Sequence, residues 1–295
     1  MAEQMNKIKQ WIVNDYFTPN IKAEVILDTL LTPYVTEILK NQAGNMFEGE
    51  LHFITKEMSV LEAKASEEDA ENGNRGTKID YILGDEKVVY LVELKTTDSS
   101  LEPKQADRYL ENCCGKDGQT KTFGDVFGNK LLSIMKGAFG KIYKKEFEKL
   151  LESDSGKRPR WDEEALRKAF GLVFITWCRR KEYNIEKPSR PYAGAARDMI
   201  RAKGWTQSDS TRSRKYLYTA GQLLDYCEDY GRTLWEKPLK LIYLTPKGGC
   251  PTKNMDSFSL VKAGEYLKEK REDEFARMLS QVMECIYEGE EQKNG

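Results

Sequence analysis

The sequence predicts an α/β or α+β protein built around a central mixed β-sheet. Apolar residues first recur at helical spacing and then follow strand patterns in three consecutive segments. A further helical segment comes next, and a later apolar stretch, "KPLKLIYLTP", has the composition of another strand. The expected order is therefore helix, three strands, helix, and then mixed segments that include a fourth strand.

The first half of the chain contains the three consecutive strands. Residues 21–41 are expected to form a helix that kinks or breaks at Pro33, and 50–64 a strand or hairpin arm. The polar "ASEEDAENGNRG" is expected to be a loop. "TKIDYIL" and "KVVYLVELKT" are two strands joined by a short turn, in which Gly84 can adopt a positive φ.

The second half is expected to be mainly helical. "EPKQADRYLENCC" has a proline that a first helical turn tolerates. Residues 128–153, 193–205, 211–235 and 260–288 have the periodicity of helices or helix pairs, whereas the apolar "GLVFITWC" is expected to be a strand.

The composition indicates a protein with a core and without a membrane segment. Of the 295 residues, 39% are hydrophobic, and no run of 18 apolar residues occurs. The first residues lack the apolar core of a signal peptide. The six cysteines have no Cys-x-x-Cys spacing, which favours reduced thiols in the cytoplasm.

Histidine is nearly absent, which excludes several classes of enzyme. His52 is the only one, so a zinc site rich in histidine cannot be built. A Ser-His-Asp or Cys-His mechanism would have to use His52, and the chain has no Gly-x-Ser-x-Gly motif. No glycine-rich phosphate loop is present either.

Charge is distributed unevenly along the chain. The net charge is −1, yet residues 155–216 contain 16 Lys and Arg against 7 Asp and Glu. This segment interleaves basic and aromatic residues, as in "KRPRW" and "RSRKYLY". Such side chains neutralise phosphates and stack on bases, so it is a candidate surface for gripping nucleic acid. Within its apolar stretch, Trp177 is better interpreted as a core residue.

The strand "KVVYLVELK" is apolar on both faces, and its end is charged. Side chains alternate along a strand, so Val88, Tyr90, Val92 and Leu94 share one face and the other begins with Val89 and Leu91. The strand is therefore expected to be central and covered on both sides. Glu93 and Lys95 follow on the second face, at the strand's end.

The partner strand adds a second carboxylate to that face. A turn of two or four residues makes the numbers of paired residues sum to an odd value. Asp80 then lies opposite an odd-numbered residue, such as Val89 or Leu91, and shares the face of Glu93 and Lys95. A turn of three residues would place Asp80 on the other face unless a bulge restored it.

Two carboxylates and an ammonium group at a sheet edge suit phosphoryl chemistry. Carboxylate oxygens are hard ligands for Mg²⁺, which also takes phosphate oxygens as ligands. The ion polarises a phosphoryl group, and a lysine can orient water or stabilise developing charge. The same three residues could also be a plain salt-bridged strand end.

At this point the sequence resembles the PD-(D/E)XK nuclease superfamily, which includes many restriction enzymes and RecB-type exonuclease domains. Asp80 in "KIDYIL" matches the family's first motif, and Glu93 and Lys95 in "VELKT" match the second. Gln105 and Tyr109 match its Gln-x-x-x-Tyr motif, ten residues after the lysine. Ile79 stands where many members have proline.

The resemblance implies a restriction-endonuclease-like αβββαβ core and a Mg²⁺-dependent nuclease, with Mn²⁺ as a substitute and DNA as the expected substrate. Asp80, Glu93 and the Leu94 carbonyl would hold the metal. Lys95 would position or activate water, and Gln105 and Tyr109 would brace the site. The family's first-helix glutamate corresponds to Glu24 as first choice and to Glu37 as second.

The expected organisation is one domain, with a core at 20–114 and 236–295 and an insertion at 115–235. A second Gln-x-x-x-Tyr, Gln222 to Tyr226, lies just before the last core strand, so the functional copy stays open. The sequence also leaves oligomeric state and endo- against exonucleolytic cleavage open.

Two alternatives remain at this level. One is a non-catalytic nucleic-acid-binding or assembly protein that keeps the same fold. The other is a hydrolase that uses His52 with a nucleophile at Cys113 or Cys114, although nothing in the sequence brings these residues together.

Overall fold

The computed structural model describes residues 23–59, 78–114, 121–128, 163–180, 190–201, 211–230, 234–252, 255–270 and 272–291. The expected loop "ASEEDAENGNRG" and nearly all of the expected helix at 128–153 lie outside these residues. Within the described part of the chain, no helix has the length and apolar character needed to cross a bilayer.

The chain divides into two compact units. The first contains residues 1–53, 79–111 and 240–295, and it includes most of the sheet and the helices next to it. The second contains residues 54–78 and 112–239, and its main elements are three helices, α7 (Glu163–Arg180), α8 (Tyr192–Arg201) and α9 (Thr211–Tyr230). The helical segments expected at 193–205 and 211–235 are thus confirmed as α8 and α9.

The first expected helix is two helices. α2 (Ala23–Leu31) and α3 (Val35–Ala43) are separated by a turn that contains Pro33, so the predicted break at proline is confirmed. In this turn, the backbone N–H of Tyr34 donates to the Leu31 carbonyl over 2.8 Å.

The sheet has five strands in the order β1-β2-β3-β4-β5. These are β1 (His52–Ser59), β2 (Lys78–Gly84), β3 (Val89–Leu94), β4 (Leu239–Thr245) and β5 (Asp256–Ser259). β2 and β3 are antiparallel, whereas β4 and β5 are parallel, so the predicted mixed sheet is confirmed. β3 is the middle strand, and all six of its residues are buried, as its apolar faces predicted. β5 was not expected, because only its pairing with β4 makes the short, polar "DSFS" a strand.

The buried carboxylate of Asp85 determines the turn between β2 and β3. It accepts hydrogen bonds from the backbone N–H groups of Lys87 (2.8 Å), Val88 (2.7 Å) and Glu48 (2.9 Å), and from the Tyr90 hydroxyl (2.8 Å). The last ladder pair is Gly84 with Val89, which leaves a turn of four residues. This is one of the two turn lengths that predict an odd register sum.

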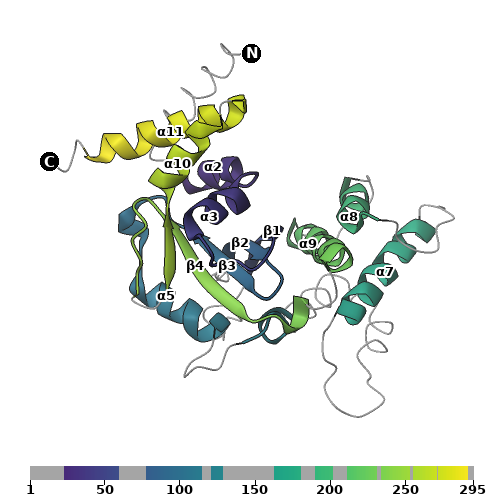
Figure 1. Ribbon diagram of the computed structural model, residues 1–295. Helices are drawn as coiled ribbons and strands as arrows, with labels where there is room; N and C mark the ends of the chain where they lie inside the picture. Colours follow the sequence, from purple (N-terminus) through teal and green to yellow (C-terminus); the bar gives the residue numbers. More distant parts are fainter. Residues whose placement is uncertain are drawn as a thin grey trace, which may run out of the picture. The chain divides into compact units, whose positions relative to one another are not determined.

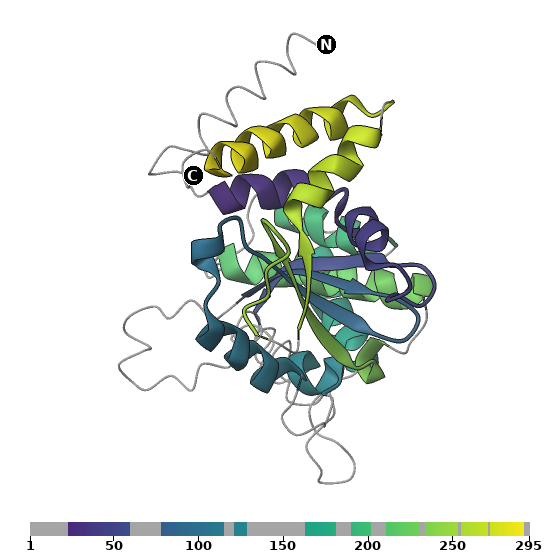
Figure 2. The same cartoon turned by 60° about the vertical axis from the view of Figure 1, so that its left-hand side comes forward.

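The two faces of the sheet are covered by different helices. One face packs with α2, α3, α10 (Leu260–Glu269) and α11 (Glu274–Glu291), which Figures 1 and 2 show gathered on one side of the strands. This confirms the expected C-terminal helix pair. The sheet side chains of this core are those of Tyr81, Leu83, Tyr90, Val92, Leu94, Ile242 and Leu244. Helix α5 (Pro103–Tyr109), which was also predicted, lies apart from this group of helices in both views.

The orientation of β3 against β4 follows from one hydrogen bond. The backbone N–H of Lys95 donates to the Leu244 carbonyl over 2.9 Å. In an antiparallel pair these two residues would be opposite each other and would share a face. Leu244, however, packs in the core with Leu94, on the face away from Lys95. The strands are therefore parallel, which places Lys95 opposite Thr245.

The prediction of a strand at 171–178 is wrong, because this segment belongs to helix α7. Leu166, Ala169, Phe170 and Val173 are all fully buried, and their spacing is that of one helix face. A short apolar run does not distinguish a buried strand from a buried helix. The burial pattern over the longer segment does, and it includes residues before the run.

Candidate active site

Asp80 and Glu93 lie opposite each other on adjacent strands. The register of β2 and β3 pairs Tyr81 with Val92, and one further step along the strands pairs Asp80 with Glu93. The two residue numbers sum to an odd value, so Asp80 lies on the face of the sheet that the sequence predicted. Its partner, however, is Glu93 and not Val89 or Leu91. A carboxylate oxygen of Asp80 accepts the backbone N–H of Leu94 over 2.7 Å, which holds the side chain against the end of β3.

Glu93 and Lys95 form a buried ion pair. Nζ of Lys95 lies 2.8 Å from Oε1 of Glu93, and the two side chains are only 9% and 4% exposed. Side chains two residues apart on a strand share a face, which brings these groups together. Withdrawal from water strengthens their attraction and makes each charge depend on the other.

Helix α5 places Tyr109 beside the carboxylates. Burial raises the pKa of Tyr109 well above its usual value, and the charges of Glu93 and Asp80 raise it further. The hydroxyl also makes a hydrogen bond with Glu93, so it stays protonated and is a donor to this carboxylate. One helical turn earlier, Nε2 of Gln105 donates to the Tyr109 hydroxyl over 3.4 Å.

Tyr243 was missed at the level of the sequence. It is 1% exposed on β4, and the parallel register that pairs Lys95 with Thr245 pairs Glu93 with Tyr243. Its hydroxyl is close enough to contribute to the raised pKa of Tyr109. The apolar pattern of "LKLIYLT" predicted a strand that contains Tyr243. No sequence pattern, however, shows which residue of this strand lies opposite Glu93, because the two strands are almost 150 positions apart.

Of the two candidates for the first-helix glutamate, only Glu37 has a side chain that the structure describes. Glu24 lies in α2, and its side chain is outside the described residues. Glu37 lies in α3 and pairs with Lys270 and with the Tyr266 hydroxyl, so it belongs to the contact with α10 and its C-terminal end. A different acidic residue of α2, Asp28, is buried, and its carboxylate contributes to the raised pKa of Tyr81.

The second Gln-x-x-x-Tyr has other contacts. Oε1 of Gln222 accepts the Thr55 hydroxyl over 2.9 Å, and the Tyr226 hydroxyl lies 3.4 Å from Nζ of the buried Lys237. All four residues belong to the second unit. Of the two copies, it is Gln105 and Tyr109 that lie with Asp80 and Glu93.

The residues of the cysteine hydrolase alternative belong to different units of the chain, His52 to the first and Cys113 to the second. His52 lies in β1 and is 3.8 Å from Glu50. Cys113 is buried in the turn that continues α5, and the side chain of Cys114 lies outside the described residues.

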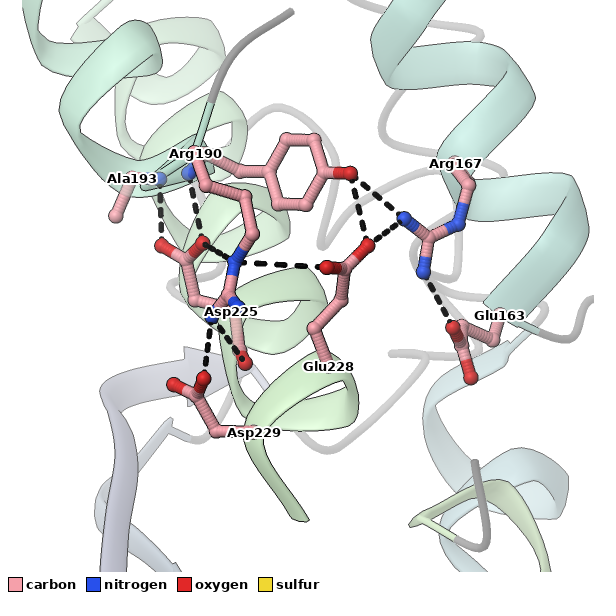
Figure 3. Close-up of polar contacts among 8 residues, drawn as sticks. Glu163, Arg167, Arg190, Ala193, Asp225, Glu228 and Asp229 are labelled. Carbon is pink, nitrogen blue, oxygen red and sulfur yellow. Dashed lines mark hydrogen bonds and ion pairs between the residues drawn. The ribbon is translucent and has the colours of Figure 1, made fainter. Parts of the chain in front are cut away.

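Two arginines of the basic segment are held by carboxylates (Figure 3). Arg167 of α7 binds Glu163 (2.6 Å), Glu228 and the Tyr192 hydroxyl. The pKa of Glu228 is lowered, chiefly by its hydrogen bond with Arg167.

Arg190 pairs with the same helix, α9, through Asp229, Asp225 and Glu228. Asp225 also accepts the backbone N–H groups of Tyr192 and Ala193, over 2.7 and 2.9 Å. These two arginines therefore join α7, α8 and α9 in the second unit. Residues 155–162, 181–189 and 202–210 of the basic segment lie outside the described residues.

The donor set at the strand ends fits Mg²⁺. Among the described residues, no three or more His, Cys, Asp or Glu side chains gather into a metal-binding group. The site offers two carboxylates and the Leu94 carbonyl. Because the N–H and C=O of an extended residue point to the same side of a strand, this carbonyl is directed towards β2, as is the N–H that Asp80 accepts. A few hard oxygen ligands suit an ion that keeps several of its waters.

Comparison of the chain with family models, curated proteins and solved structures gives no match.

Proposed function

We propose that this protein is a Mg²⁺-dependent nuclease that hydrolyses phosphodiester bonds, with DNA as the substrate. One observation carries the proposal: Asp80, Glu93 and Lys95 share one face at the ends of two adjacent strands, and their charged groups are in contact or directly opposite. Buried charged groups that contact one another in this way gather at catalytic sites.

The element order supports a restriction-endonuclease-like core. Helices α2 and α3 precede three strands, helix α5 follows, and β4 then lies beside β3. This is the αβββαβ order of the PD-(D/E)XK proteins that the motifs resemble, with β5 as an additional strand. In this interpretation the second unit is largely an insertion between α5 and β4.

Asp80, Glu93 and the Leu94 carbonyl would hold the ion. When bound, Mg²⁺ supplies polarisation of the phosphoryl group and makes water more acidic. The hydrogen bond from Leu94 keeps Asp80 at the end of β3, and Tyr109 keeps Glu93 turned towards the same place. Both carboxylates are thus oriented before substrate arrives, so little reorganisation is needed.

Lys95 would hold the attacking water and balance the charge that develops on phosphorus. Its ammonium group is the cation that contacts Glu93, next to the carboxylates that bind the ion. A buried ammonium group in a site of low water content interacts strongly with an anionic transition state. Gln105 acts through Tyr109 and is a positioning residue.

A cleavage assay tests the proposal. Circular and linear DNA, single- and double-stranded, are incubated with Mg²⁺, Mn²⁺ or EDTA, using wild type, Lys95→Ala and the exposed control Lys40→Ala. We expect metal-dependent cleavage by wild type and the control, and a loss of at least about 10²-fold in Lys95→Ala, as for a group that stabilises the transition state. Preference for circular or linear DNA then separates endo- from exonucleolytic cleavage.

The main alternative is a binding or assembly protein that keeps this fold without catalysis. In that case wild type shifts DNA in a gel but cuts none, and Mg²⁺ does not raise its melting temperature. A nuclease gives the opposite pattern: Mg²⁺ stabilises wild type, and the stabilisation disappears in Glu93→Ala. Cleavage that persists in Lys95→Ala would mean that the site is elsewhere.

A further inference from the structure

The loop after β4 is held by hydroxyl groups of the sheet. The Pro246 carbonyl accepts the Ser259 hydroxyl over 3.0 Å and the backbone N–H of Val261 over 3.2 Å. The Gly248 carbonyl accepts the Ser257 hydroxyl over 2.5 Å. These three hydrogen bonds hold two carbonyls of the loop against β5 and the start of α10.

A third hydroxyl completes this arrangement. Thr245, at the end of β4, donates to the Gly249 carbonyl over 3.1 Å. Three carbonyls within four residues are therefore turned towards the sheet. The turn that allows this has Gly248 at a φ of +77°, a conformation that glycine adopts without strain.

The inward carbonyls determine where the N–H groups point. In a planar trans peptide, the C=O of one residue and the N–H of the next are directed oppositely. The N–H groups of Lys247, Gly249 and Cys250 are thus directed away from the sheet hydroxyls. All three residues are exposed, and Lys247 adds a positive charge. Exposed main-chain N–H groups of a turn, next to a cation, are donors that an anion can accept from.

The loop lies at the same strand ends as the candidate active site. Thr245, which holds Gly249, is opposite Lys95 in the parallel register derived above. Across the sheet, Asp80 lies opposite Glu93, Glu93 opposite Tyr243, and Tyr243 opposite Ser257. The hydroxyl of Ser257, which holds the Gly248 carbonyl, therefore lies in the same row of residues as the two carboxylates. A Cβ atom placed on Gly249 would lie 3.8 Å from Leu101, in the segment that leads from Lys95 to α5.

We propose that the loop 246–250 binds a phosphate of the nucleic acid next to the one that is cleaved, through main-chain N–H groups and Lys247. This inference rests on the proposed nuclease function. The loop contacts the phosphodiester backbone and no base, so it contributes to affinity and to the positioning of the substrate but not to sequence specificity.

Binding of a fluorescently labelled oligonucleotide tests this, by anisotropy in EDTA, where metal-dependent cleavage is absent. For Lys247→Ala we expect weaker binding and a salt dependence, log Kd against log salt concentration, that is shallower by about 1. When the salt concentration is raised fourfold, the affinity of Lys247→Ala should therefore fall by a factor about fourfold smaller than that of wild type. Thr29→Ala, which removes an exposed hydroxyl bonded to the Val25 carbonyl, is the control for unrelated surface changes.

Gly249 provides a matched pair that isolates the N–H group. Gly249→Pro deletes it, whereas Gly249→Ala keeps it and meets only Leu101 at an ordinary contact distance. We expect binding to fall several-fold in the proline variant and to stay near wild type in the alanine variant, with both folded by circular dichroism.

The outcomes separate the two proposals. If wild type binds and cleaves DNA while Lys247→Ala and Gly249→Pro bind as wild type does, the loop proposal is overturned and the nuclease stands. If wild type neither binds nor cleaves any nucleic acid, the proposed function fails and the loop proposal fails with it.

Discussion

Replacing Lys95 by methionine tests whether the buried ion pair with Glu93 is a cation site. Methionine keeps an apolar stem of similar length but has no charge. The Glu93 side chain is 4% exposed, so the variant leaves a carboxylate out of water with its nearest cation removed. Breaking a buried pair on one side costs about 3–5 kcal/mol. Exposed pairs typically contribute about 0–1 kcal/mol, so burial makes the difference measurable.

The assay is urea unfolding of wild type, Lys95→Met and the double variant Lys95→Met/Glu93→Gln in EDTA. We expect the single variant to lose about 3 kcal/mol or more, and the double variant to recover most of this, because no buried charge is left unpaired. The control is Lys268→Met, whose partner Glu284 is exposed enough for water to replace the ammonium group.

Mg²⁺ then distinguishes a cation site from a purely structural pair. A ligand that binds the folded state stabilises it by RT ln(1 + [L]/Kd). In Lys95→Met the ion no longer competes with the ammonium group for Glu93, so Mg²⁺ should stabilise this variant more than wild type. A loss below about 1 kcal/mol in EDTA would refute the reasoning about burial. An equal effect of Mg²⁺ on both proteins would refute the reasoning about the cation site.

Three further predictions concern groups outside the candidate site. Asp85→Ala should cost about 3 kcal/mol or more in urea unfolding, because four donors, one of them the buried Tyr90 hydroxyl, lose a charged acceptor; the exposed Asp98→Ala should cost little. The pKa of Asp273 is lowered by the N–H of Ala276 and the Tyr34 hydroxyl, so its stabilisation is present above the unfolded pKa of about 4 and is lost as pH falls through the folded value. Asp273→Asn should therefore flatten the decline of unfolding free energy at acid pH, and an unchanged slope would contradict this. Burial raises the pKa of Cys227 to about 12, so iodoacetamide at pH 8 should label exposed Cys250 and leave Cys227 unmodified in the native protein, as read by peptide mass mapping.

Local pattern was sufficient where the two interacting segments are close in the chain. Alternation along "KVVYLVELK" predicted a central strand with Glu93 and Lys95 on one face, and the short turn predicted the face of Asp80. The break at Pro33 and the helices α5, α8, α9, α10 and α11 also followed from local signals. Each of these depends on one segment or on a hairpin, where geometry leaves few alternatives.

Local pattern was insufficient where distant segments decide. "GLVFITWC" is helical because the residues before it complete a buried helix face, and β5 is a strand because β4 lies beside it. Glu37 has a suitable type and position in sequence, yet it pairs with Lys270, more than 200 positions away.

The sequence by itself determined that Glu93 and Lys95 share one face at the end of β3, because side chains two residues apart on a strand point the same way. Asp80 joins that face because the turn between β2 and β3 has four residues. Only the tertiary structure decided what surrounds them, namely Tyr109 interacting with Glu93, Tyr243 opposite Glu93, and a loop held by Thr245, Ser257 and Ser259. The physical reason is that side-chain direction within a strand is set by the backbone alone. Which strands and helices lie next to one another is set by the burial of the whole core, and no short segment contains that information.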